Sequence, residues 1–172
     1  MRLLFSLLTL IFPPPDVELS RLFPRTQSPP GVVIPAAFGR LLYGRCALMV
    51  AQSATSDGCD GFFTPTPEEI AALETQLPLF LRSHLGVTQW RPFIPALGAP
   101  LIARMLRDRR QYIGIILRGR SSIWLDVADC DDDANGLFHW PDSVADGGDC
   151  YWRVLFDLES RTFSGLELNP SA

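Results

Sequence analysis

The stretch that decides the fold is "QYIGIILRGRSSIWLDVA", residues 111–128. Apolar side chains recur there at every second position on both sides of a short polar link: Ile113, Ile115 and Leu117 precede it, and Ile123, Leu125 and Val127 follow it. A period of two is typical of a half-buried β-strand. The link, "RGRS" at 118–121, contains a glycine, which favours a tight turn. The stretch therefore predicts a β-hairpin.

Two further strands are predicted toward the C-terminus. In "CYWRVLFD", residues 150–157, the apolar side chains of Trp152, Val154 and Phe156 share one face. In "TFSGLELN", residues 162–169, Leu166 and Leu168 point inward after a turn near residue 160. We therefore expect four antiparallel strands joined as a meander, with one apolar face and one polar face.

An amphipathic helix is predicted just before this sheet, in "TPTPEEIAALETQLPLFLRSHL", residues 64–85. Thr66 is a good N-cap, Pro67 suits the first helical position, and Glu69 completes a capping box. Apolar residues follow at helical spacing, namely Ile70, Leu73, Leu77 and Leu81. Pro78 is expected to kink the helix or to end it early. With a second helical segment over 101–109, the predicted fold class is α+β: an N-terminal helix, or two, packed on a four-stranded antiparallel meander.

Residues 1–60 are predicted to be a poorly ordered leader and linker, and residues 61–172 a single domain. Seven prolines between positions 13 and 35 argue against a regular helix or a central strand there. At most a short helix is expected near 36–51. The first residues, "MRLLFSLLTLIF", resemble a secretory signal, and a second region that a signal peptidase could cut lies at Ala51 and Ser53. These features predict export to the periplasm or the medium, with a cytoplasmic location as the alternative.

Composition restricts the classes of partner. Of the 172 residues, 47% are hydrophobic and 20% charged, which is typical of a globular chain. The net charge of −4 provides no general affinity for nucleic acid. No apolar run reaches the roughly 18 residues that span a bilayer. We therefore expect neither a nucleic-acid partner nor a transmembrane span in the mature domain.

A long connection, residues 131–149, separates the second and third predicted strands, and Cys130 and Cys150 bracket it. If these strands pair, the two cysteines face each other at a separation that a disulfide can bridge. Closing such a loop contributes about 3 kcal/mol in the chain-entropy model and needs an oxidising compartment. The alternative is two free thiols in a cytosolic protein.

The connection also carries the ligand spacing of an EF-hand calcium loop, with oxygens at Asp131, Asp133, Asn135 and Asp142 and a glycine in sixth place. A strand precedes the loop and no helix is predicted on either side, so we keep calcium as an alternative and commit to no metal site. At the end of the loop, "DGGD" is interpreted as a corner, in which two glycines allow the turn and two aspartates cap backbone amides; it comprises Asp146, Gly147, Gly148 and Asp149.

Charge clusters allow two interpretations. Eight aspartates lie between positions 126 and 149, and six arginines lie between 104 and 120. They either pair with each other on solvated faces, or the acidic loop docks on a basic partner surface.

Catalysis has little support in the sequence. Of the two histidines, His84 ends the predicted helix, where it suits the helix dipole. His139 lies near Cys130, but a cysteine in a disulfide is no nucleophile. No phosphate-binding loop, nucleophile elbow or zinc-protease motif occurs. We therefore predict no catalytic residue, no cofactor and no enzymatic activity.

The C-terminal part contains "RRQYIGI" at 109–115, Trp140, "DGGD" at 146–149, "WRVLFDLESRTFSGLELN" at 152–169 and the final alanine. In these residues it resembles a group of small, uncharacterised and often exported bacterial proteins. The resemblance implies export and a domain that starts near residue 60, and it implies no catalytic residue.

The sequence thus favours a non-enzymatic, exported bacterial protein that binds a protein partner through its acidic 131–149 loop or an exposed sheet face. One alternative is a calcium-binding domain that uses the loop at 131–142. Another is an intracellular inhibitor or immunity-type protein without a disulfide.

Overall fold

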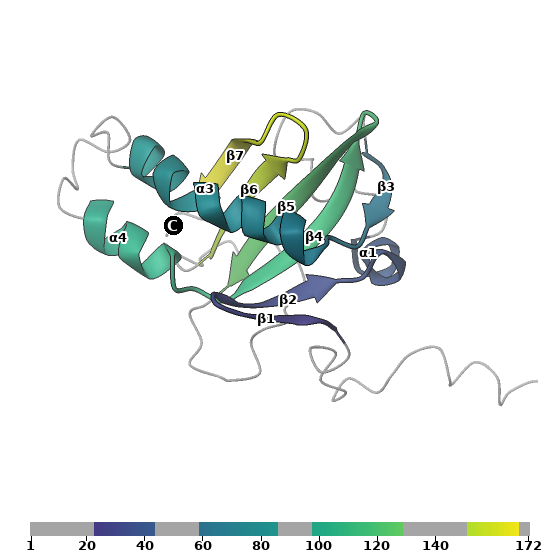
Figure 1. Ribbon diagram of the computed structural model, residues 1–172, viewed down its shortest axis with the longest axis horizontal. Helices are drawn as coiled ribbons and strands as arrows, with labels where there is room; N and C mark the ends of the chain where they lie inside the picture. The colour runs from purple at the N-terminus through teal and green to yellow at the C-terminus, as the bar shows by residue number, and fades with distance from the viewer. Residues whose placement is uncertain (1–22, 44–58, 86–97, 129–150, 169–172) are drawn as a thin grey trace, which may run out of the picture.

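The computed structural model describes residues 23–43, 59–85, 98–128 and 151–168 (Figure 1). The strands are β1 (Arg25–Gln27), β2 (Pro30–Ile34), β3 (Cys59–Phe63), β4 (Arg110–Leu117), β5 (Arg120–Ala128), β6 (Tyr151–Asp157) and β7 (Thr162–Leu168). The helices are α1 (Ala36–Tyr43), α3 (Pro67–Leu85) and α4 (Gly98–Met105). The fold class is α+β, as predicted, but the long helix α3 lies in the middle of the chain and is not N-terminal.

Among the described residues, seven strands form one mixed, mostly antiparallel sheet in the order β1-β2-β4-β5-β6-β7, with β3 paired to β4. Strands β4 to β7 form the predicted antiparallel meander. On its other edge, β4 pairs in parallel with β2 along its first half and antiparallel with β3 along its second half. The four-stranded meander is thus one part of a larger sheet.

The hairpin predicted from residues 111–128 is confirmed. Leu117 pairs with Arg120 across a two-residue turn in which Arg118 and Gly119 have φ of 50° and 73°. Positive φ at both central positions is the type I′ geometry that matches the twist of the flanking strands.

The N-terminus of α3 is the predicted capping box. The Thr66 amide donates to Glu69 Oε2 at 2.7 Å, and the Glu69 amide donates to Thr66 Oγ1 at 3.2 Å. Pro78 does not end the helix, which continues to Leu85. A proline removes one backbone hydrogen bond, but Leu77 and Leu81 are fully buried on either side of it and hold both turns against the sheet.

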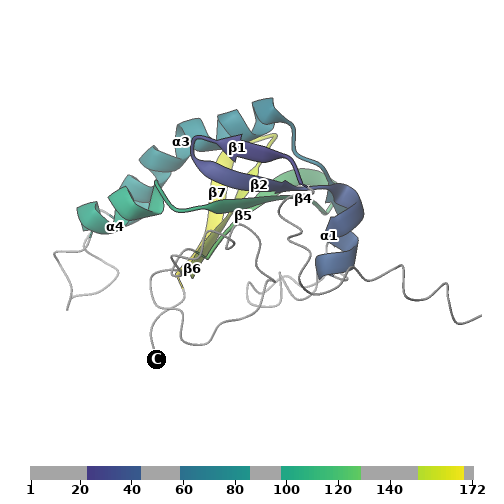
Figure 2. The ribbon, with the colours of Figure 1, turned by 90° about the horizontal axis from the view of Figure 1, so that it is seen from below.

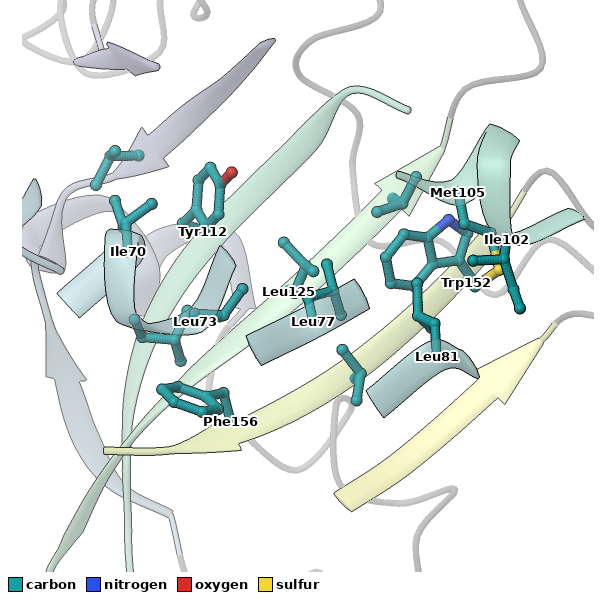
Figure 3. Close-up of a cluster of buried hydrophobic side chains, with 14 residues drawn as sticks. Ile70, Leu73, Leu77, Leu81, Ile102, Met105, Tyr112, Leu125, Trp152 and Phe156 are labelled. Atoms are coloured by element: carbon teal, nitrogen blue, oxygen red, sulfur yellow. The ribbon is translucent and has the colours of Figure 1, made fainter. Parts of the chain in front are cut away.

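Helices α3 and α4 pack on what we call the first face of the sheet (Figures 1 and 2). The core between them contains Leu73, Leu77 and Leu81 from α3, opposite Leu125, Trp152 and Phe156 from the strands (Figure 3). Each of these six side chains is buried. Helix α4 begins and ends a few residues before the predicted 101–109 segment, and it contributes Ile102 and Met105 to the same core.

The other side of the sheet, the second face, is not uniformly polar, so the predicted polar face is wrong for β4. Ile113 pairs with Trp124, which places Ile113 on the face opposite to Leu125. A second buried cluster forms there and consists of Phe23, Val32, Ile34, Ile113, Ile115 and Trp124. Phe38 of α1 and Phe62 of β3 pack against it. β4 is therefore buried on both faces, as a central strand is.

Residues 23–43 differ from the leader and linker that the sequence predicts. They form β1, β2 and α1, and β2 is an interior strand of the sheet. Pro30 opens β2 and Pro35 follows it, so the prolines flank the apolar run and do not interrupt it.

Candidate functional site

The residues of the predicted loop sites lie outside the described residues. They are the calcium candidates Asp131, Asp133, Asn135 and Asp142, the cysteines Cys130 and Cys150, the turn residues Asp146, Gly147, Gly148 and Asp149, and His139. The calcium, disulfide and acidic-loop hypotheses therefore stay predictions. Cys59, which is described, does not carry a free thiol.

Two simple kinds of site are not seen in the described part of the chain. No three side chains of the histidine, cysteine, aspartate or glutamate type gather there closely enough to hold a metal ion. Nor does any helix in the described ranges have the length and apolar character to cross a membrane.

One polar region lies between α3 and the sheet, and we call it the buried polar cluster: Glu74 of α3 with Arg110 and Tyr112 of β4. The Tyr112 hydroxyl donates to Glu74 Oε1 at 2.9 Å, and Arg110 Nε lies 3.4 Å from the same oxygen. Arg110 Nη2 donates to the Met105 carbonyl at 3.0 Å. The Arg110 side chain is fully buried, and its Nη1 has no hydrogen-bond partner in the described structure.

Burial dominates the ionisation of this cluster. Desolvation raises the pKa of Glu74, although the positive charge of Arg110 and the hydrogen bond from Tyr112 act in the opposite direction. Burial, and then the negative charge of Glu74, raise the pKa of Tyr112 well above its ordinary value. Glu74 of α3 and Tyr112 of β4 are engaged with each other, so the cluster ties α3 to the sheet.

A second buried polar pair lies in the same layer. The Trp152 indole Nε1 donates to Asp108 Oδ2 at 3.0 Å, and both residues are buried. This bond satisfies a polar atom that a buried tryptophan would otherwise leave without a partner.

The other polar region is an open concavity at the turn end of the meander, which we call the hairpin-end concavity. It encloses about 290 Å³. It is lined by Leu117, Arg118, Arg120, Ser122, Leu155, Asp157, Ser160, Thr162 and Ser164. It lies on the second face, since Ser122 and Leu155 alternate with first-face residues of β5 and β6. α1 packs farther along that face, against β3 and β4.

Asp157 organises one wall of this concavity. It accepts hydrogen bonds from the Ser160 amide at 2.7 Å and the Ser160 hydroxyl at 2.8 Å, and Arg120 Nη2 lies 2.8 Å away. Burial raises the pKa of Asp157, but the Ser160 hydrogen bonds and the Arg120 charge outweigh it and hold the pKa below its ordinary value. Asp157 is therefore a charged, satisfied group that fixes the turn.

Two arginines at this end have an unusual backbone conformation. Arg118, in the β4–β5 turn, has φ of 50°, and Arg161, in the β6–β7 turn, has φ of 54°. They are the non-glycine residues with positive φ among the described residues. Both are exposed.

Arg118 belongs to the arginine cluster at 104–120 but was not predicted as a site residue, and neither was Arg161. A usable signal was present: each arginine occupies a short turn between two strands, where one position usually needs positive φ. Arg120 pairs with Asp157, which lies outside the aspartate cluster at 126–149, so pairing between the two predicted clusters stays a prediction.

Comparisons with protein-family models, with curated proteins and with solved structures find no match for this chain. The assignment of function therefore depends on the geometry of the chain itself.

Proposed function

We propose that this protein is a non-enzymatic, exported module that binds a protein partner on the second face of its sheet, at the hairpin-end concavity. The observation that carries the proposal is the contrast between the two faces: α3 and α4 cover the first face, whereas this end of the second face presents hydroxyl and guanidinium groups around a hollow. Polar groups that converge on a concave surface are typical of binding sites.

We propose no reaction because of where the ionisable side chains with shifted pKa lie in the described structure. The groups with raised pKa, Glu74 and Tyr112, are hydrogen-bonded to each other between α3 and β4. Asp157 keeps its charge and is held by Ser160 and Arg120. None of the three is an accessible general acid or base of the kind that catalysis needs.

The test is enrichment of partners from an envelope extract with the full-length protein and two variants. Ser164→Arg places a long side chain in the concavity, and Thr75→Arg places the same side chain on an exposed position of α3. We expect a partner identified with the wild type, and confirmed by reciprocal purification, to lose at least about tenfold in affinity with S164R and to be unaffected by T75R.

Equal affinity of the partner for wild type and S164R would overturn the proposed surface. If, in that case, a variant with Asp131→Asn and Asp133→Asn loses the partner, binding belongs to the acidic loop.

Export is tested separately, by fractionating cells that produce the C-terminally tagged protein and determining its mature N-terminus. We expect the tag in an exported fraction and a cut before Phe23, because this side chain is buried in the second-face cluster. A cut near Ala51 would remove β1, β2 and α1, so it would contradict this fold. A tag found only in the cytoplasm with an intact N-terminus would contradict export.

A further inference from the structure

Arginine is a costly choice at two neighbouring turns. A side chain with a Cβ rarely adopts positive φ, and glycine or asparagine serves such positions with less strain. Arg118 and Arg161 nevertheless occupy them, in the turns that end the two hairpins. Strain of this kind gathers at functional positions, because the side chain is retained for what it contacts.

The two turns lie at the same end of the sheet. The Leu158 amide, in the second turn, donates to the carbonyl of Ser121, just after the first turn, at 3.0 Å. Arg118 lines the hairpin-end concavity, and Arg161 stands between Ser160 and Thr162, which also line it. Arg118 therefore lines the hollow, and Arg161 belongs to the neighbouring turn, between two residues that line it.

Charges at this end are equal in number: Arg118, Arg120 and Arg161 stand near Asp60, Asp157 and Glu159, and Asp60 Oδ2 accepts a hydrogen bond from the Gly119 amide at 2.6 Å. Arg120 is committed to the carboxylates of this end, with Asp157 at 2.8 Å and Glu159 at 3.6 Å. Neither Arg118 nor Arg161 forms an ion pair within the described structure. A negatively charged group that enters the concavity therefore meets Arg118, which lines it without an ion pair in the described structure, and Asp157, whose charge Arg120 compensates.

The size and lining of the concavity match a small group and not a large ligand. Its volume of about 290 Å³ is at the lower end for ligand pockets. The Ser164 hydroxyl lines the concavity as a further donor, whereas the Thr162 hydroxyl is bonded to the Ser160 hydroxyl at 2.7 Å. Guanidinium groups bind carboxylate and phosphate through two parallel hydrogen bonds, which gives both affinity and orientation.

We propose that the hairpin-end concavity binds a small oxyanion, the carboxylate or phosphate group of a protein partner, through Arg118 and Arg161. This inference rests on the proposed function, since it names the chemical group that the partner presents to the second face. Asp157 and Arg120 act as positioning residues that hold the turn.

The test is an NMR titration of the full-length ¹⁵N-labelled protein with sodium phosphate and, separately, with sodium acetate, at constant ionic strength. We expect saturable shifts at the amides of Gly119, Arg161 and Thr162. The stronger of the two anions identifies the group as phosphate or carboxylate. Arg118→Asn and Arg161→Asn each keep a turn-compatible residue and remove the guanidinium, and each should weaken binding by about tenfold.

Arg82→Gln is the charge-matched control, because Arg82 is exposed near the end of α3. It should leave both titrations unchanged. Shifts that do not saturate, or equal affinity in the R118N/R161N double variant, would overturn the oxyanion site. If S164R abolishes partner binding while the double variant keeps the full partner affinity, the oxyanion inference fails and the proposed function stands.

Discussion

Two arginine–carboxylate pairs in this protein have similar chemistry and opposite surroundings. Arg110 and Glu74 lie between β4 and α3, and the Arg110 side chain is 0% exposed; Arg120 and Asp157 lie at the hairpin end, where the Arg120 side chain is 51% exposed. Around the buried pair, the Met105 carbonyl accepts from Arg110 and the Tyr112 hydroxyl donates to Glu74. Around the exposed pair stand strained arginines and an open hollow. Burial makes a polar group a structural requirement, whereas exposure leaves it available to a partner.

The largest expected effect comes from breaking the buried pair. Arg110→Met leaves Glu74 of α3 facing the sheet without its cation, so we expect a loss of about 3–5 kcal/mol in the free energy of unfolding. The matched change in the exposed pair, Arg120→Met, should cost at most about 1 kcal/mol. Urea unfolding of both variants measures the difference, and equal losses would contradict the assignment of the two pairs to different roles.

A smaller effect is expected from a methyl group added beside the buried cluster. A Cβ at Gly31 would lie 2.6 Å from Tyr112 Cε2 and 2.7 Å from Thr26 Oγ1. Gly31→Ala should therefore destabilise the protein by about 1–3 kcal/mol through overpacking. The control is Gly61→Ala, whose Cβ would approach no atom closer than 3.9 Å. If thermal unfolding shows both variants at wild-type stability, the packing around Tyr112 is looser than described.

The pH dependence of stability should have opposite signs in the two regions. Glu74 has a raised pKa in the folded protein, so its contribution is fully present below its ordinary pKa and is lost as pH rises through the folded value. Asp157 has a lowered pKa, so its contribution is present above its ordinary value and is lost as pH falls through the folded one.

These signs are measured as differences between wild type and Glu74→Gln or Asp157→Asn in the free energy of unfolding, from about pH 3 to pH 8. The stability of wild type relative to E74Q should fall above about pH 4.3, the ordinary glutamate value. The stability of wild type relative to D157N should rise as the pH increases to about 4 and should then stay constant. The same sign for both carboxylates would argue against the comparison.

The smallest expected effect is a gain in stability. Arg118→Asn and Arg161→Asn replace strained residues by one that tolerates positive φ, so each should add up to about 1 kcal/mol to the free energy of unfolding. Differential scanning calorimetry of the single variants measures it. A clear loss of stability would mean that these arginines support the fold and are not retained for binding.

Much of the architecture could be predicted from local patterns. The Thr66–Glu69 capping box and the helical spacing from Ile70 to Leu81 predicted α3, because both signals act within a few residues. The period of two predicted the strands of the meander. The turn itself has only two residues, Arg118 and Gly119, and this fixes the register that pairs Ile113 with Trp124. The predicted link of four residues, 118–121, does not reveal that the apolar residues before and after the turn lie on opposite faces of the sheet.

The features that could not be predicted depend on contacts between distant parts of the chain. The run from Gly31 to Ile34 is too short to show a period, and its place beside β4 comes from parallel pairing with residues far away in sequence. The hairpin-end concavity needs two turns brought together by the sheet. The backbone angles of Arg118 and Arg161 follow from the geometry of those turns and not from the preference of arginine.

The most direct test of the central claim is thermal unfolding of wild type, the R118N/R161N double variant and R82Q, each with and without phosphate at constant ionic strength. A ligand that binds the folded state raises its midpoint. We predict that phosphate raises the unfolding midpoint of wild type and of R82Q. Without phosphate, the double variant should unfold at a higher temperature than wild type, and phosphate should raise its midpoint little. A double variant that is less stable than wild type, or that responds to phosphate as wild type does, would contradict the account.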